Sequence, residues 1–220
     1  MKIYSIKNLN GMSSYYVGIN QIEIDPKEVQ IDDLVELNEI VHNHHKGTIL
    51  QFFNDRYILN PQHILLACYF VQKAFHTNTN ISNKKNLEFL LYLSSKRQIK
   101  LSLESFGVND YNLRDKRISF CIISSEDNID QVNIEINKHL NSKKISSNFE
   151  DLSEDKYIII KNYFGFSDNQ ILTVLKSYGH KVDILNEDSM NIESLYGVLN
   201  DLICEKMVLL SLEKKIPYKN

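Results

Sequence analysis

The hydrophobic pattern along the chain predicts strands and helices in alternation. Four stretches have the apolar alternation or the continuous apolar character of strands: residues 2–6, 14–24, 48–53 and 117–124. In the second stretch the apolar phase reverses around Asn20 and Gln21, which indicates a bulge or a turn, because a regular strand keeps its phase. The last two stretches are apolar almost throughout, so we expect them to be buried in the sheet.

Apolar residues recur at helical spacing in most of the remaining chain. The expected helices lie at residues 33–44, 60–75, 86–108 (two short helices), 127–140, 155–163, 167–178 and 192–212. Three starts carry capping signals: Asp33 with Glu36, Ser167 with Gln170, and Asn60 followed by Pro61. From Leu202 on, the final helix is apolar on more than one side. One side can therefore pack on its own domain while another faces a partner.

These elements predict a single α/β (α+β) domain over residues 1–220. We expect a mixed, mainly antiparallel sheet of four to five strands surrounded by helices, with a long C-terminal helix. The polar, serine-rich segment 141–151 is the best candidate for a flexible loop, and residues 179–190 are expected to be irregular. No stretch approaches the about 18 consecutive apolar residues of a membrane span.

Composition and charge narrow the class of protein. The chain is 43% hydrophobic and 24% charged, as globular domains are, and its net charge of −3 gives no general attraction to nucleic acid or to an anionic membrane. Cys68, Cys121 and Cys204 lie in separate apolar runs, which indicates buried thiols in a reducing compartment. Because the N-terminus lacks the long apolar core of a signal peptide, a cytoplasmic protein is expected.

One basic segment stands out within residues 86–108. Ser94 and Ser95 interrupt the apolar helix and are expected to end it and to cap the next, because their hydroxyls compete for backbone groups. Lys96, Arg97 and Gln98 follow on the first turn of the second helix, where N–H groups lack partners and an anion is favoured. The positive charges of the wider segment are Lys84, Lys85, Lys96, Arg97 and Lys100, with Glu88 alone against them.

Signals for catalysis are weak. The glycines form no phosphate-binding loop and no CxxC or HExxH pattern is present, so neither a cofactor nor a metal is expected. His42, His44 and His45 are clustered, and a solvated helix end explains them better than a metal site does. Cys68 lies in an amphipathic helix and fits a core thiol better than a nucleophile.

Three further residues leave alternatives open. His63 lies in the first turn of its helix, where it can be a plain helix-start residue or a contact to RNA. Asp55 and Arg56 can form an ion pair within a turn, which we favour, or border the same RNA groove.

Three segments resemble a known family: NPQHILLA at 60–67, LEFLLYLSSKRQI at 87–99 and LICEKMVLLSL at 202–212. With the preceding strand TILQFF, they are similar to the small regulatory subunit of the KEOPS (EKC) complex, the PRPK-binding protein of animals. The junction ending in Arg-Gln-Ile is the most specific part. Ser102 replaces an expected alanine, Glu205-Lys206 replaces Glu-Arg, and residues 141–191 are longer and more polar than expected. The Asn-, Lys- and Ile-rich composition suggests an archaeal source.

The resemblance implies a non-catalytic subunit and not an enzyme. The family binds the small atypical kinase of the complex, of PRPK/Bud type, and supports its activity, with the other KEOPS subunits reached indirectly. Archaeal members bind the acceptor 3′ end of tRNA for threonylcarbamoyladenosine modification. The expected RNA contacts are Lys84, Lys85, Ser95, Lys96, Arg97, Gln98, Lys100 and His63, and the expected kinase contacts are Ile203, Met207 and Leu210. A pure kinase adaptor without RNA contact is the alternative.

Overall fold

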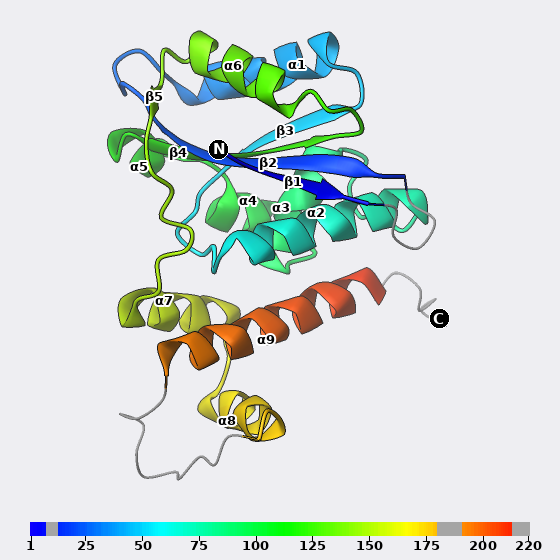
Figure 1. The fold of residues 1–220 in the computed structure, drawn as a ribbon, viewed down its shortest axis with the longest axis vertical. Helices are drawn as coiled ribbons and strands as arrows, with labels where there is room; N and C mark the ends of the chain where they lie inside the picture. Colours follow the sequence, from blue (N-terminus) through cyan, green and yellow to red (C-terminus); the bar gives the residue numbers. More distant parts are fainter. Residues whose placement is uncertain (8–12, 180–190, 213–220) are drawn as a thin grey trace.

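An antiparallel sheet crosses the middle of the protein (Figure 1). The computed structural model describes residues 1–7, 13–179 and 191–212. Its strands are β1 (Lys2–Ile6), β2 (Tyr15–Glu23), β3 (Thr48–Phe53), β4 (Arg117–Ser124) and β5 (Lys143–Lys144). The order is β1-β2-β4-β3, and β5 pairs with the far end of β2. Every strand pairing in the described ranges is antiparallel. A five-stranded sheet surrounded by helices, with a long C-terminal helix, confirms the predicted α/β (α+β) fold.

Helices form layers on both sides of the sheet (Figure 1). One face is covered by α1 (Ile31–His44) and α6 (Ile129–His139). On the other face lie α2 (Pro61–His76), α3 (Lys85–Ser94) and α4 (Ile99–Phe106). A further layer beneath α2 and α3 contains α7 (Glu154–Phe164), α8 (Asp168–Ser177) and the long α9 (Ile192–Leu212). The short helix α5 (Asp110–Arg114), which the pattern did not predict, leads into β4. Within these ranges no helix combines the length and apolar character needed to cross a bilayer.

The sheet separates two apolar cores, and this explains the reversed phase in β2. Val17 and Ile19 belong to the core shared with α2, α3 and α9, whereas Ile22 belongs to the core beneath α1 and α6. The pairing of β2 with β4 runs without a break along the strand. The predicted bulge is therefore wrong. The strand keeps its phase, and apolar side chains change face because both faces are covered by helices.

Two of the predicted helix starts form as expected, and one is shifted. Asn60 accepts the His63 N–H at 3.0 Å, and the Ser167–Gln170 capping box is present. The first helix begins earlier than Asp33. Asp33 instead accepts the backbone N–H of Gln30 at 2.7 Å, which makes it the third residue of the helix.

The segment 141–151 is tied to the sheet at several points, so the prediction of a loop is wrong for part of it. β5 pairs with β2, and the N–H of Asn148 donates to the side chain of Gln21 at 2.9 Å. Phe149 is buried and stacks on Phe53 of β3. A single aromatic anchor in a polar stretch gives no periodic signal, which explains the error. Residues 180–190 of the expected irregular segment lie outside the described residues.

Candidate binding surfaces

Helix α3 ends in a left-handed turn that leads into α4. Ser95 has φ 51° and ψ 33°, a conformation that is unfavourable for residues other than glycine. The N–H groups of Ser95 and Lys96 donate to the carbonyl oxygens of Tyr92 and Leu91, at 3.0 and 3.1 Å. These two bonds close a Schellman motif, so the backbone of the junction is well defined.

Two buried hydroxyls hold the junction from inside. Ser94 Oγ lies 2.7 Å from Ser102 Oγ of α4 and accepts the Lys96 N–H at 3.2 Å. The Ser102 hydroxyl also lies 3.2 Å from the carbonyl oxygen of Gln98. Ser94 and Ser95 were expected to cap α4, but they do not. Gln98 is the residue before that helix, and no side-chain hydrogen bond caps it. Ser102, which departs from the alanine of the resemblance, thus joins the two helices.

The exposed polar side chains at this point are Lys96, Arg97, Gln98 and Lys100, and we refer to them as the junction surface. They lie at the start of α4, where the helix dipole and N–H groups also favour an anion. Lys100 forms an i,i+4 pair with Glu104 at 3.9 Å. Both side chains are exposed, so this pair is weak and leaves Lys100 able to meet a ligand.

Lys84 and Lys85 do not join the junction surface. They lie at the opposite end of α3, about 14 Å away at 1.5 Å per helical residue. Lys85 donates to Gln72 and lies over the ring of Phe75, and burial lowers its pKa. Glu88 is fully buried, where its carboxylate accepts backbone N–H groups of the preceding loop. The helix therefore separates charges that the sequence grouped into one patch.

Ser95, a predicted RNA contact, has an inaccessible hydroxyl. Its oxygen is shielded from solvent and has no hydrogen-bond partner among the described residues. A buried polar atom without a partner costs about 1–3 kcal/mol. RNA can reach this oxygen only after a local movement, and the contact would then recover that cost.

His63 is not on the surface, and the prediction that it contacts RNA is wrong for this conformation. Its side chain is fully buried. Nε2 lies 3.0 Å from the carbonyl oxygen of Leu93, and the N–H of Leu59 donates to Nδ1 at 3.3 Å, which places the ring proton on Nε2. Burial lowers the pKa of His63 to about 4. The neutral imidazole therefore supports the last turn of α3 from below.

Aromatic and cationic side chains from two other segments reach the junction surface. The rings of Tyr57, after β3, and Tyr163, in α7, stack with centroids 4.2 Å apart and an interplanar angle of 21°. The guanidinium carbon of Arg56 lies 5.7 Å from the Tyr57 centroid, and the Lys96 ammonium lies 6.0 Å from the Tyr163 centroid. Tyr163 also donates to Ser105 of α4 at 2.9 Å. We refer to Arg56, Tyr57, Tyr163 and Lys96 as the tyrosine stack.

The tyrosine stack was not predictable from local sequence patterns. The favoured Asp55–Arg56 ion pair is not formed, because the Asp55 carboxylate accepts hydrogen bonds from Ser119 at 2.7 Å and from Gln21. Arg56 is left on the surface, in agreement with its other interpretation as a groove residue. Tyr163 carries no local signal, because only the packing of α7 brings it beside Tyr57 and the junction.

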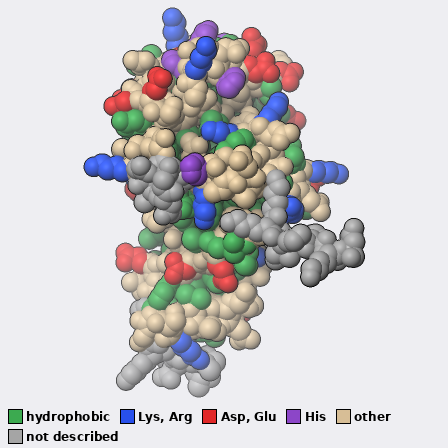
Figure 2. Space-filling model, turned by 90° about the vertical axis from the view of Figure 1, so that its right-hand side faces the viewer, with side chains coloured by type: hydrophobic (Ala, Val, Ile, Leu, Met, Phe, Trp, Pro, Cys, Tyr) green, Lys and Arg blue, Asp and Glu red, His purple; other side chains and the backbone are tan. Residues whose placement is uncertain are grey.

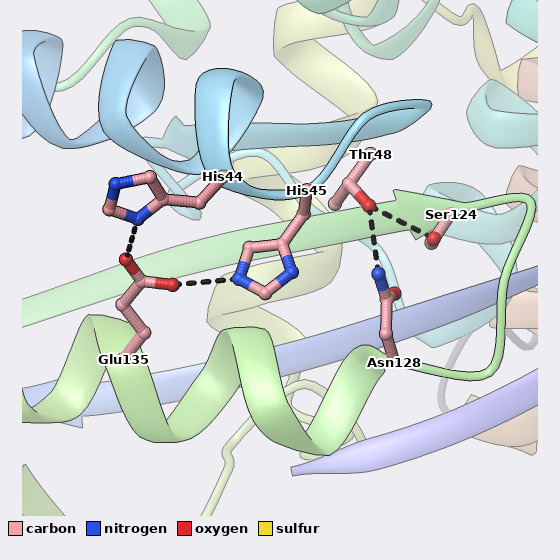
Figure 3. A network of polar contacts seen from close by, with 6 residues as sticks. All are labelled: His44, His45, Thr48, Ser124, Asn128 and Glu135. Carbon is pink, nitrogen blue, oxygen red and sulfur yellow. Dashed lines mark hydrogen bonds and ion pairs between the residues drawn. The ribbon is translucent and has the colours of Figure 1, made fainter.

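His44 and His45, at the end of α1, form a clamp to Glu135 of α6 (Figure 3). One oxygen of Glu135 lies 2.7 Å from His44 Nδ1, and the other lies 2.7 Å from His45 Nε2. Partial burial opposes ionisation, but the two hydrogen bonds prevail and lower the pKa of Glu135. In the described parts of the chain, no group of three or more His, Cys, Asp or Glu side chains is placed to hold a metal ion. The cluster therefore joins two helices of one layer.

The side of α9 that was predicted to contact the kinase is the side that packs in the core. Ile203, Met207 and Leu210, predicted to face the kinase, lie in the core with exposures of 0%, 0% and 5%. They pack in the core formed with α2 and α3. The sequence could not choose between the sides, because a helix that is apolar nearly all round has no unique inward face.

The outer face of α9 is apolar and acidic. In the C-terminal half of the helix its exposed residues are Asp201, Glu205, Val208, Leu209 and Leu212. Figure 2 shows hydrophobic and acidic side chains side by side on the lower half of the molecule, where α8 and α9 lie. Contiguous exposed apolar residues bordered by polar ones are typical of a protein-binding surface.

A sheet between helical layers, with an exposed apolar helix face and a small cationic junction, defines a protein built to bind partners. The chain belongs to the family of the kinase binding protein CGI-121, whose model matches residues 28–211. This match spans α1 to α9 and includes both the junction surface and the outer face of α9. It confirms the family recognised from the sequence and supports a kinase-binding role. No curated protein matches the chain in sequence.

Proposed function

We propose that this chain is a non-catalytic subunit of the KEOPS complex that binds its atypical PRPK/Bud-type kinase and supports its activity. The subunit also recruits tRNA through the acceptor 3′ end for threonylcarbamoyladenosine modification. Membership of the kinase-binding family is the observation that carries the proposal. The junction surface and the outer face of α9, both on the side of the sheet that α2 and α3 cover, supply separate places for the two partners.

The outer face of α9 supports the kinase half of the proposal. Leu209 and Leu212 are about half exposed, at 52% and 46%, and they are one helical turn apart. A few side chains that become fully desolvated in well-packed pockets supply most of the binding energy at such interfaces. Asp201 and Glu205 border them, so a complementary kinase surface combines an apolar groove with basic residues.

The junction surface supports the RNA half. A single-stranded RNA end needs positive charge for its phosphates and hydrogen-bonding groups for sugars and base edges. Lys96, Arg97 and Lys100 supply the charge, and Gln98 supplies an amide. Lys84 and Lys85, at the far end of α3, can only contact a more distant part of a long RNA.

Replacing Lys96 and Arg97 together with alanine is expected to weaken tRNA binding about tenfold and to flatten its salt dependence. Each lost phosphate contact to a single strand lowers the slope of log K against log salt by about 0.7. Electrophoretic shifts at several salt concentrations measure both quantities. Replacing Lys138, an exposed cation of α6 on the other face of the sheet, is the matched control and should leave both unchanged.

A pure kinase adaptor remains the second candidate function. The small size of the junction surface and the shielded Ser95 hydroxyl favour it. Co-purification of the kinase without any tRNA shift at low salt would support the adaptor and contradict the RNA half of the proposal. An unchanged salt slope in the Lys96/Arg97 variant would rule out these two residues as phosphate contacts.

A further inference from the structure

The tyrosine stack extends the junction surface from Lys96 toward Arg56, and it adds two aromatic rings to the charged side chains. Tyr57 and Tyr163 come from the β3–α2 loop and from α7, and each ring is partly exposed. Their inner edges rest on Phe106, whose centroid lies 6.0 Å from that of Tyr57 and 5.6 Å from that of Tyr163. This buried ring and the bond from Tyr163 to Ser105 fix the pair at the side of α4.

A cation lies over the ring of each tyrosine: Arg56 over Tyr57, and Lys96 over Tyr163. Both distances are near the about 6 Å limit of cation–π attraction, so each contact is weak and easily exchanged. Both cations are exposed, and Asp55, the nearest acidic residue in sequence, turns inward to Ser119. The stack therefore presents two positive charges, each beside an aromatic ring.

We propose that the tyrosine stack is a binding subsite for single-stranded RNA, in which a base stacks on Tyr163 while Lys96 and Arg56 bind successive phosphates. This inference rests on the proposed RNA function of the junction surface and adds Arg56, Tyr57 and Tyr163 to it. The phosphate draws the Lys96 ammonium off the ring, and the base takes its place. Alternating cations and aromatic rings are the arrangement that binds single strands without reading their sequence.

The position of the stack indicates the path of the strand. Lys96 belongs both to the junction surface and to the stack, so the two sites are continuous. A strand whose end lies at the start of α4 would continue past Lys96 and Tyr163 toward Arg56. Backbone and stacking contacts of this kind bind the strand whatever its bases, whereas contacts from Gln98 at the end can distinguish them.

The test compares binding of a short single-stranded RNA oligonucleotide by Tyr163→Leu and Tyr163→Phe. We expect Tyr163→Leu to lose about tenfold in affinity, because stacking on one base is removed, and Tyr163→Phe to bind within about twofold of the original chain. Arg56→Ala should lower the salt slope by about 0.7. Lys138→Ala, on α6, is the control.

Because the chain has no tryptophan, Tyr163→Trp also provides a unique fluorophore, whose emission should be quenched by the oligonucleotide.

The possible results separate this inference from the function on which it rests. If Lys96→Ala with Arg97→Ala weakens RNA binding but the Tyr163 and Arg56 variants do not, the tyrosine stack is not a subsite, while the proposed function stands. An original chain that binds neither oligonucleotide nor tRNA at low salt overturns both. The Arg56 substitution lies on the surface, so it decides the question even if Tyr163→Leu impairs folding.

Discussion

A chain in which Leu209 and Leu212 are both replaced by aspartate is expected to lose at least about 100-fold in affinity for its kinase. Each leucine is about half exposed in the free chain, so both can become buried in a complex. Truncating central apolar anchors typically costs about 2–4 kcal/mol, and burying a new carboxylate adds a desolvation penalty. Pull-down of the purified kinase, followed by titration calorimetry, measures the loss.

The chain offers a close control for this experiment. Val35 of α1 has an exposure of 53%, almost that of Leu209, but it lies on the opposite side of the sheet. Val35→Asp should leave kinase binding unchanged. If Leu209→Asp with Leu212→Asp binds the kinase as tightly as the original chain does, the kinase contacts another surface. Substituting Ile203, Met207 or Leu210 would not be informative, because these residues hold the core and their loss would affect folding.

Acidification from pH 6.5 to pH 4 is expected to lower the free energy of unfolding by about 3 kcal/mol through His63 alone. The pKa of this histidine is 6.5 in an unfolded chain and about 4 in the folded one, because burial disfavours the charged form. Between these values the unfolded state binds more protons, so stability falls as the pH falls. The contribution becomes constant about one pH unit above 6.5 and about one unit below 4.

Urea unfolding at a series of pH values tests this expectation. In His63→Gln the amide can still donate to the carbonyl oxygen of Leu93 and accept the N–H of Leu59, but it cannot titrate. The variant should therefore show a flatter profile than the original chain between pH 6.5 and 4. Equal slopes in the two proteins would mean that His63 is not buried in a neutral form. Because His63 supports the end of α3, acid is expected to loosen the junction as well.

The fold was predictable because most of its signals are local. Strands 48–53 and 117–124 were bounded correctly, since continuous apolar runs and flanking polar residues mark both ends. The Asn60-Pro61 start also follows from the chemistry of one dipeptide. The prediction of a bulge at Asn20 and Gln21 was wrong, and the reason lies in the tertiary packing. An alternation that changes face looks irregular unless it is known that helices cover both faces of the sheet.

The binding surfaces were less predictable, because packing decides which side chains reach the surface. His63 was predicted to contact RNA and Met207 to contact the kinase, yet both are fully buried. Lys85 and Lys96 belong to the same basic segment of the sequence, but they lie at opposite ends of α3. Tyr163 comes beside the junction only through the packing of α7. Lys96, Arg97, Gln98 and Lys100 of the recognised motif are exposed at a helix start, and their contact with RNA stays a prediction.

The most direct test of the proposed function compares two forms of tRNA. The purified chain is titrated with intact tRNA and with the same tRNA lacking its single-stranded 3′ end, at one low salt concentration. Because the junction surface and the tyrosine stack are both proposed to bind a single strand, we predict that the truncated tRNA binds about tenfold or more weakly. Equal binding of the two forms would contradict recruitment through the 3′ end.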